Sequence, residues 1–252
     1  MDVLVCIKRV PMVGTALILN DDGTELDTRR LGFQLSPHEE NAVEAAVQLI
    51  EQHGGTVTLL TMGTAESEEQ LREQLAIGAD RAIIALTDGT EPDPQATVGG
   101  LLEAIRADGA AFDVILLGSE SADVGGYQTG IRLAHALGLP VVTNVKGLSI
   151  ADGTARCERA VGSEREVYEV TLPAVITVKD GLNIPRYPSV PGRIKARKKP
   201  VTTHEVSIAA PRIVKHRLVV PPATAKGTKV LEPNADGAAV LVDVFREIGV
   251  LS

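Results

Sequence analysis

The chain has 252 residues and a net charge of −8; 44% of its residues are hydrophobic, 2% are aromatic and Trp is absent. This length fits one large α/β domain or a domain with an arm, and an aliphatic core suits a parallel sheet flanked by helices. The shortage of aromatic residues argues against base stacking on single-stranded nucleic acid. The sequence contains no run of 18 apolar residues and no signal-peptide pattern, so we expect a cytoplasmic protein without a membrane span.

The charges are unevenly distributed along the chain. Residues 191–252 carry 11 Lys and Arg against 5 Asp and Glu, which gives +6, so residues 1–190 carry 14 against 28, which gives −14. An acidic body is poorly suited to binding DNA, whereas a basic tail suits an arm that reaches across a partner protein. The cluster from Arg193 to Lys199 is equally compatible with a solvated run. Only two cysteines are present, and they are not spaced with each other or with histidines as metal ligands are. We therefore expect neither a disulfide framework nor a metal site.

The first part of the chain alternates between strands and helices. Residues 2–7 form a short apolar run typical of a buried strand, and Ser36-Pro37 followed by acidic residues is typical of a helix start. The helix ends at Gly54-Gly55. Further predicted elements are strands at 56–61, 81–86 and 113–117 and helices at 65–76, 95–107 and 128–137. This order predicts a doubly wound, mostly parallel sheet of the adenine-nucleotide-binding type.

The pattern changes after Pro140. Residues 141–146, 147–150, 154–158 and 166–171 alternate like antiparallel strands, with a hairpin turn at Asp152-Gly153, and 173–178 is another buried strand. Four prolines in residues 181–200 exclude a regular helix or central strand over the first half of that segment. A Pro-rich extended stretch and a helix at about 235–248 follow. We therefore expect a nucleotide-binding domain at 1–200 with a small antiparallel extension, and a long C-terminal arm at 201–252.

Ligands of such sheets bind beyond the carboxyl ends of the strands, where the strand order switches. Three predicted strand ends supply candidate segments: Cys6–Pro11, Thr61–Gly63 and Gly118–Gly130. The last places small residues ahead of a helix, where backbone N–H groups and the helix dipole favour a phosphate; an ordinary Gly-rich connection is the alternative. Standard nucleotide-binding and hydrolase motifs are missing. We therefore expect a nucleotide-binding domain without catalytic residues of its own.

Residues 181–199, GLNIPRYPSVPGRIKARKK, closely resemble the signature of electron-transfer flavoprotein β subunits. Further similarity lies in Leu172–Thr177, in Gln128-Thr129-Gly130 and in the tail from Pro221 to Gly249. The resemblance implies a heterodimer in which the α subunit holds most of the FAD, the β crevice holds AMP and the β arm embraces α. It also implies electron transfer from flavin dehydrogenases to a quinone-linked oxidoreductase or another acceptor.

The pattern and the resemblance together assign candidate residues. We expect the nucleotide to contact residues of the three strand ends and of the predicted helix start: Cys6, Lys8, Ser36, Thr61, Met62, Gly63, Ser119, Asp123, Gly125, Gly126, Tyr127, Gln128, Thr129 and Gly130. The resemblance implies that Val13 and His38 approach the edge of the FAD held by α. It also implies that the proline-stiffened loop docks the dehydrogenase through Val190, Pro188, Tyr187 and Arg186.

The chain departs from the family pattern at three places. Ser36 stands where Asn is frequent, Val124-Gly125 lack an acid of the phosphate loop, and Ala160 replaces a Glu that follows Glu158-Arg159. Because GxGxxG is missing, we expect AMP in the crevice; a second FAD, as in electron-bifurcating relatives, is the alternative. A stand-alone adenine-nucleotide-binding regulatory module and an ATP-consuming ligase or pyrophosphatase are the other readings, and the latter would need an SGGxDS-type loop after the first strand.

Overall fold

The computed structural model describes residues 1–14, 17–222 and 230–251, and it divides into two compact units, Met1–Arg217 and Leu218–Ser252. The first unit contains a seven-stranded sheet in which every described pairing is parallel. In spatial order the strands are β12 (Val201–Glu205), β5 (Arg81–Leu86), β4 (Thr56–Gly63), β1 (Asp2–Ile7), β6 (Val114–Gly118), β11 (Ala174–Val178) and β7 (Val141–Val145). The predicted α/β class is confirmed.

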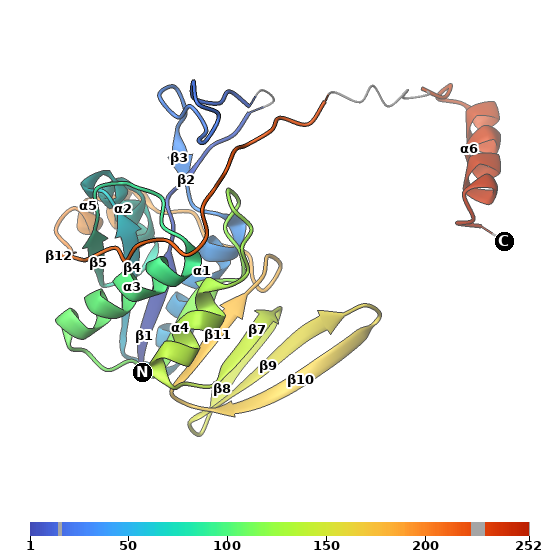
Figure 1. Ribbon diagram of the computed structural model, residues 1–252. Coiled ribbons are helices and arrows are strands. Elements are labelled where there is room, and N and C mark those ends of the chain that lie inside the picture. The colour runs from blue at the N-terminus through green and yellow to red at the C-terminus, as the bar shows by residue number, and fades with distance from the viewer. Residues whose placement is uncertain (15–16, 223–229, 252) are drawn as a thin grey trace. The chain divides into compact units, whose positions relative to one another are not determined.

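Helices cover both faces of this sheet (Figure 1). On one face lie α1 (Pro37–His53) and α2 (Glu68–Ile77), which follows the short helix η1 (Ala65–Ser67), with α5 (Val190–Ala196) packed on α2. On the other lie α3 (Pro94–Asp108) and α4 (Thr129–Leu137). Two aliphatic cores result, and the central strand β1 sends alternate side chains into each, for example Val5 into the first and Leu4 into the second.

Strand β7 corrects part of the sequence-based prediction. We expected residues 141–146 to begin a set of antiparallel strands, but β7 pairs in parallel with β11 at the edge of the main sheet. The alternation that suggested an antiparallel strand has another cause, because an edge strand is only partly covered: Val142 is buried and Val141 exposed. The antiparallel extension begins one strand later and contains β8 (Gly147–Ala151), β9 (Thr154–Val161) and β10 (Glu164–Thr171).

The segment after residue 200 begins inside the first unit. Its first residues form β12, which hydrogen-bonds along β5, and the compact unit continues to Arg217. A two-stranded ribbon of β2 (Val10–Pro11) and β3 (Phe33–Gln34) stands beyond the end of β1. The second unit contains α6 (Ala235–Glu247), which Asn234 caps by accepting the N–H of Gly237 at 3.0 Å. No helix among the described residues combines the length and apolarity needed to cross a membrane.

Candidate functional site

The strand order switches at β1. From β1 the chain continues through α1 to β4 and then β5 on one side, and α3 brings it back to β6 on the other side of β1. The loops that leave β1 and β6 therefore diverge to opposite faces, and the crevice between them is the expected ligand position in such sheets. All three segments predicted from the sequence lie at this carboxyl edge, because β4, β1 and β6 are adjacent and parallel.

Lys8, which directly follows β1, joins the segment after β5 to the loop after β6. Its Nζ lies 2.7 Å from Asp123 in the loop after β6 and 2.8 Å from Glu91 in the segment after β5. Burial alone would lower the pKa of Lys8, but the two carboxylates outweigh it and raise that pKa. Burial also raises the pKa of Asp123. The charge and the hydrogen bond of Lys8 lower it by more, so the pKa of Asp123 is below its usual value. Lys8 thus stays protonated, and its charge is compensated by the two carboxylates that it joins at this edge.

Glu39, in the first turn of α1, joins the segment after β1 to the start of α1. Its carboxylate accepts the N–H of Lys8 at 2.7 Å and the N–H of Ser36, the N-cap of α1, at 2.9 Å. Burial raises the pKa of Glu39 to about 7 even though both hydrogen bonds and the Lys8 charge act to lower it. The Oγ of Ser36 in turn accepts the N–H of Ala122 at 2.9 Å. Ser36 is therefore an internal link between α1 and the loop after β6.

The loop from Ser119 to Gln128 leads directly into the amino end of α4. Gly125 and Tyr127 both have positive φ, of 59° and 53°; glycine adopts this conformation freely, but for Tyr127 it is strained, and such strain concentrates at ligand sites. No side chain caps α4, and the N–H groups of Gly126 and Tyr127 donate to no described residue. Uncapped N–H groups at a helix start favour an anion.

The start of α4 packs closely on β11. A Cβ added to Gly130 would overlap the Cγ2 of Thr177, so glycine is required for this approach. The Oγ1 of Thr177 lies 3.0 Å from the Oγ of Ser119 and accepts the N–H of Asn144 at 3.2 Å. Ser119 thus has its hydroxyl engaged with the sheet, and the neighbouring Thr129 begins the helix itself.

The other residues predicted for the crevice lie in or just after the strands. Cys6 is buried in the core between the sheet and α3 and α4, and burial together with Glu39 raises the pKa of its thiol to about 12, so the thiol is unreactive. Thr61 is buried at the end of β4 and its Oγ1 has no partner among described residues. Met62 packs against Gly100 of α3, and Gly63 lies against Ser67. Gln128 accepts a hydrogen bond from Arg132 at 3.0 Å.

The two residues assigned to the flavin edge differ in exposure. Val13, two residues after β2, is exposed, whereas His38 at the start of α1 is only 7% exposed. The His38 Nε2 lies 3.2 Å from Asp180 and its Nδ1 has no partner in the described part of the chain. Asp180 follows β11 and Glu120, 4.0 Å from the same ring, follows β6. His38 is therefore held at the carboxyl edge by two loops.

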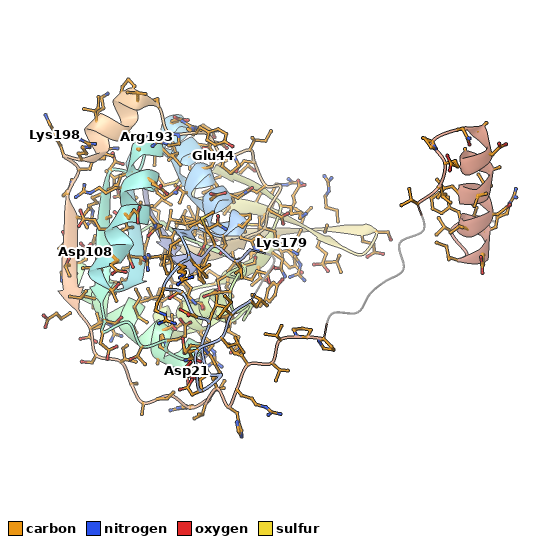
Figure 2. All side chains as sticks on the ribbon, turned by 90° about the horizontal axis from the view of Figure 1, so that it is seen from above. Asp21, Glu44, Asp108, Lys179, Arg193 and Lys198 are labelled. Atoms are coloured by element: carbon orange, nitrogen blue, oxygen red, sulfur yellow. The ribbon has the colours of Figure 1, made fainter. Side chains whose placement is uncertain are left out.

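In the predicted docking loop, Arg186 differs from its exposed neighbours because it binds carboxylates of α1. Tyr187 and Val190 are exposed, and Val190 is the first residue of α5. Pro188 lines a hollow of about 200 Å³ between α2 and α5. Arg186, in contrast, binds α1, with its guanidinium 2.9 Å from Glu44 and 2.6 Å from Glu51. Figure 2 labels Glu44 of α1, Arg193 of α5 and Lys198 just after α5.

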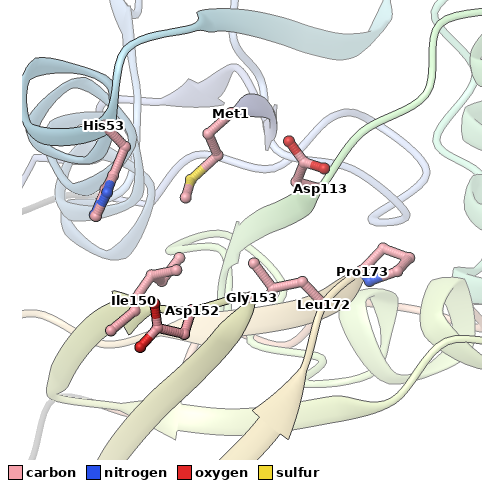
Figure 3. A pocket seen from close by; sticks show the side chains of 9 residues that line it. Met1, His53, Asp113, Ile150, Asp152, Gly153, Leu172 and Pro173 are labelled. Atoms are coloured by element: carbon pink, nitrogen blue, oxygen red, sulfur yellow. The ribbon is translucent and has the colours of Figure 1, made fainter.

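A separate cavity of about 340 Å³ lies at the opposite edge of the sheet (Figure 3). It is bordered by Met1 and Asp113, which precede β1 and β6, and by the turn at Asp152. Because it adjoins the amino ends of the parallel strands, it is remote from the carboxyl edge where sheets of this type bind ligands.

Comparisons with known proteins identify the family of this chain. A family model described as "Electron transfer flavoprotein domain" matches residues 24–209. The electron transfer flavoprotein subunit beta of Bacillus subtilis is 36% identical over 236 residues, covering 90% of this chain and 89% of that protein. The chain belongs to the electron transfer flavoprotein β-subunit family. Relatives of this family include the subunit beta of Syntrophomonas wolfei, 35% identical over 90% of this chain and 89% of its own, and the caffeyl-CoA reductase-Etf complex subunit CarD of Acetobacterium woodii, 37% identical over 80% and 77%.

Sequence reasoning missed several residues that organise this electron transfer flavoprotein β chain. Glu39 was noticed only as an acid of the first helical turn, although an acid three residues after Ser36 is also the signature of a capping box. Glu91 carries no sequence signal, and Thr177 stands only within the resembling segment Leu172–Thr177, because their contacts with Lys8 and Ser119 join segments far apart in the chain.

Proposed function

We propose that this chain is the β subunit of a heterodimer that carries electrons from flavin dehydrogenases to a quinone-linked or other acceptor in the cytoplasm. Membership of the family supports the electron-carrier role and the partnership with an α subunit. The α subunit holds most of the FAD, and this chain covers one edge of it through Val13 and His38. The flavin supplies the redox chemistry when it is bound, and the residues of this chain position and shield it.

The crevice holds AMP. The observation that carries this assignment is the uncapped start of α4, whose N–H groups and those of Gly126 and Tyr127 lie at the same edge as the cation of Lys8. These groups fit one phosphate, with the adenosine between the loops after β1 and β6. Thr61, whose Oγ1 has no hydrogen-bond partner among the described residues, is a neutral polar group at this edge that suits a nucleoside. A second FAD is the competing occupant.

Acid extraction of the purified heterodimer tests the assignment. We expect one FAD and one AMP per heterodimer by chromatography of the extract. Two flavins per heterodimer and no AMP would favour the bifurcating alternative. Turnover of ATP by the chain alone would instead favour the ligase reading. In the variant Lys8→Gln we expect the AMP content to fall while the FAD content stays near one, because Lys8 faces the crevice of this chain.

A further inference from the structure

The part of the predicted arm that directly follows β12 lies within the first compact unit. We call residues 206–217 the arm root. It contains no helix or strand, yet it belongs to the unit that ends at Arg217. Figure 1 shows it leaving β12 and passing α3. A segment without secondary structure needs other elements to supply partners for its backbone, so its contacts identify what fixes its course.

Two polar contacts hold the two ends of the arm root. Near its beginning, Ser207 donates its backbone N–H to Glu103 of α3 at 3.0 Å. Near its end, the Nζ of Lys215 lies 3.2 Å from Glu25, between β2 and β3. Both contacts are exposed, and the side chains of Lys215 and Glu25 are 40% and 55% exposed. Pairs of this kind contribute little because water and salt screen them.

Asp93 holds the middle of the arm root and is only 9% exposed. Its Oδ1 accepts the N–H of Ala96 at 2.8 Å and thereby caps α3. Its Oδ2 accepts two consecutive backbone N–H groups of the arm root, from Arg212 and, at 3.1 Å, from Ile213. The hydrogen bonds from Ala96 and Arg212 lower the pKa of Asp93 below its usual value, although burial opposes them. The carboxylate is therefore ionised, and hydrogen bonds to an ionised acceptor are the stronger kind.

One side chain thus has two separate tasks. One oxygen of Asp93 serves the helix that follows it, and the other serves a segment more than 100 residues later in the chain. Capping requires only the first oxygen. The second oxygen does nothing for α3, so its contact with Arg212 and Ile213 has to be explained by what the arm root does.

We infer that Asp93 is a positioning residue for assembly, which fixes the arm root so that the α subunit binds an arm whose first part is already ordered. This inference rests on the proposed partnership with an α subunit and names a residue on which the lifetime of the heterodimer depends. A segment that is ordered before binding loses less conformational entropy when its partner captures it. Without Asp93, the exposed contacts at the two ends of the arm root would have to fix it alone.

The loop that contains Asp93 also reaches the crevice, but through a different side chain. Glu91, two residues earlier, lies 2.8 Å from the Nζ of Lys8, whereas Asp93 binds only α3 and the arm root among the described residues. A substitution at Asp93 therefore leaves the pair of Glu91 and Lys8 in place. The effect on assembly can thus be separated from an effect on the nucleotide.

The test uses the FAD-loaded heterodimer with the variant Asp93→Ser. Ser caps a helix about as well as Asp, but it has no second oxygen for the arm root. We expect the heterodimer to dissociate about tenfold faster, measured as exchange of the chain against an excess of labelled chain, because ordering even one freed residue costs about that factor. The matched control is Asp88→Ser, which removes the same charge from the same loop at a residue that accepts only the N–H of Thr90. The control leaves the dissociation rate unchanged.

Hydrogen exchange separates the two tasks of Asp93. In Asp93→Ser we expect faster exchange at the amides of Arg212 and Ile213, with the amide of Ala96, the melting temperature and the AMP content as in the wild type. The second variant, Asp93→Ala, loses the cap as well. It lowers the melting temperature but dissociates no faster than Asp93→Ser. If only Asp93→Ala dissociates faster than the wild type, the effect belongs to α3 and the inference is wrong.

The outcomes separate this inference from the function on which it rests. If Asp93→Ser dissociates at the wild-type rate, or if its amides at 212 and 213 exchange no faster, the positioning role is overturned while the proposed function stands. Faster dissociation together with a loss of AMP would mean that residue 93 acts through the crevice, and the inference is then also wrong. A wild-type chain that forms no heterodimer with a co-expressed α subunit contradicts the proposed function itself.

Discussion

Glu39 is the residue whose ionisation has the clearest consequence for stability. Its carboxyl has a pKa of about 7 in the folded chain because of burial, against 4.5 when unperturbed. The unfolded chain therefore loses this proton first as the pH rises, and the folded state becomes less stable between about pH 4.5 and 7. Below 4.5 both states are protonated, and above 7 the penalty is complete.

The variant Glu39→Gln removes this titration. We expect the free energy of unfolding of the wild type, relative to that of Glu39→Gln, to fall by about 2 kcal/mol between pH 5 and pH 8. The amide accepts only one of the two N–H groups that the carboxylate accepts, so the variant is less stable at pH 5. Urea titrations at both pH values measure the difference, and parallel pH profiles of the two proteins would contradict the prediction.

Val190 is the residue of the docking segment with the simplest test. The variant Val190→Ala removes two methyl groups from an exposed side chain, worth about 1–1.5 kcal/mol if a partner buries them. We expect a roughly tenfold weaker apparent affinity for the dehydrogenase, with an unchanged melting temperature and nucleotide content. A lower melting temperature with intact electron transfer would mean that Val190 packs within its own chain.

Among the elements, the start of α4 determines the shape of the crevice. The variant Gly130→Ala places a Cβ against Thr177 and forces the helix away from β11. We expect a loss of about 1–3 kcal/mol in the free energy of unfolding together with a lower AMP content, because the N–H groups of the helix start move. The matched control is Gly99→Ala in α3, where the new Cβ meets open space and stability rises by about 0.5–1 kcal/mol. Full AMP content in Gly130→Ala would separate α4 from nucleotide binding.

At the scale of the whole molecule, the chain divides at Arg217 into two units, and we expect the first to fold by itself and the second to serve assembly with the α subunit. The first unit contains the whole sheet and both cores, and α6 of the second exposes Val240, Leu241 and Val242. We expect truncation after Arg217 to abolish heterodimer formation in co-expression with the α subunit while the melting temperature of the isolated chain changes little. Truncation after Glu247, which spares α6, is the control. Unchanged heterodimer formation on gel filtration would show that the second unit is dispensable for assembly.

The sequence by itself determined the features that depend on local pattern. The strand and helix order up to β11, the start of α1 at Ser36-Pro37 and the family signature at 181–199 follow from neighbouring residues, whereas β12 at 201–205, which the sequence placed in the arm, was decided by its pairing with β5. Tertiary structure alone decided the direction of β7, because alternation describes a half-covered strand and not its partner. It also decided that Arg186 pairs with Glu44 of α1 and that Lys8 pairs with Glu91, since both contacts join segments more than 80 residues apart. Charge pairing at such distances depends on the folded arrangement of the loops, which residue spacing does not encode.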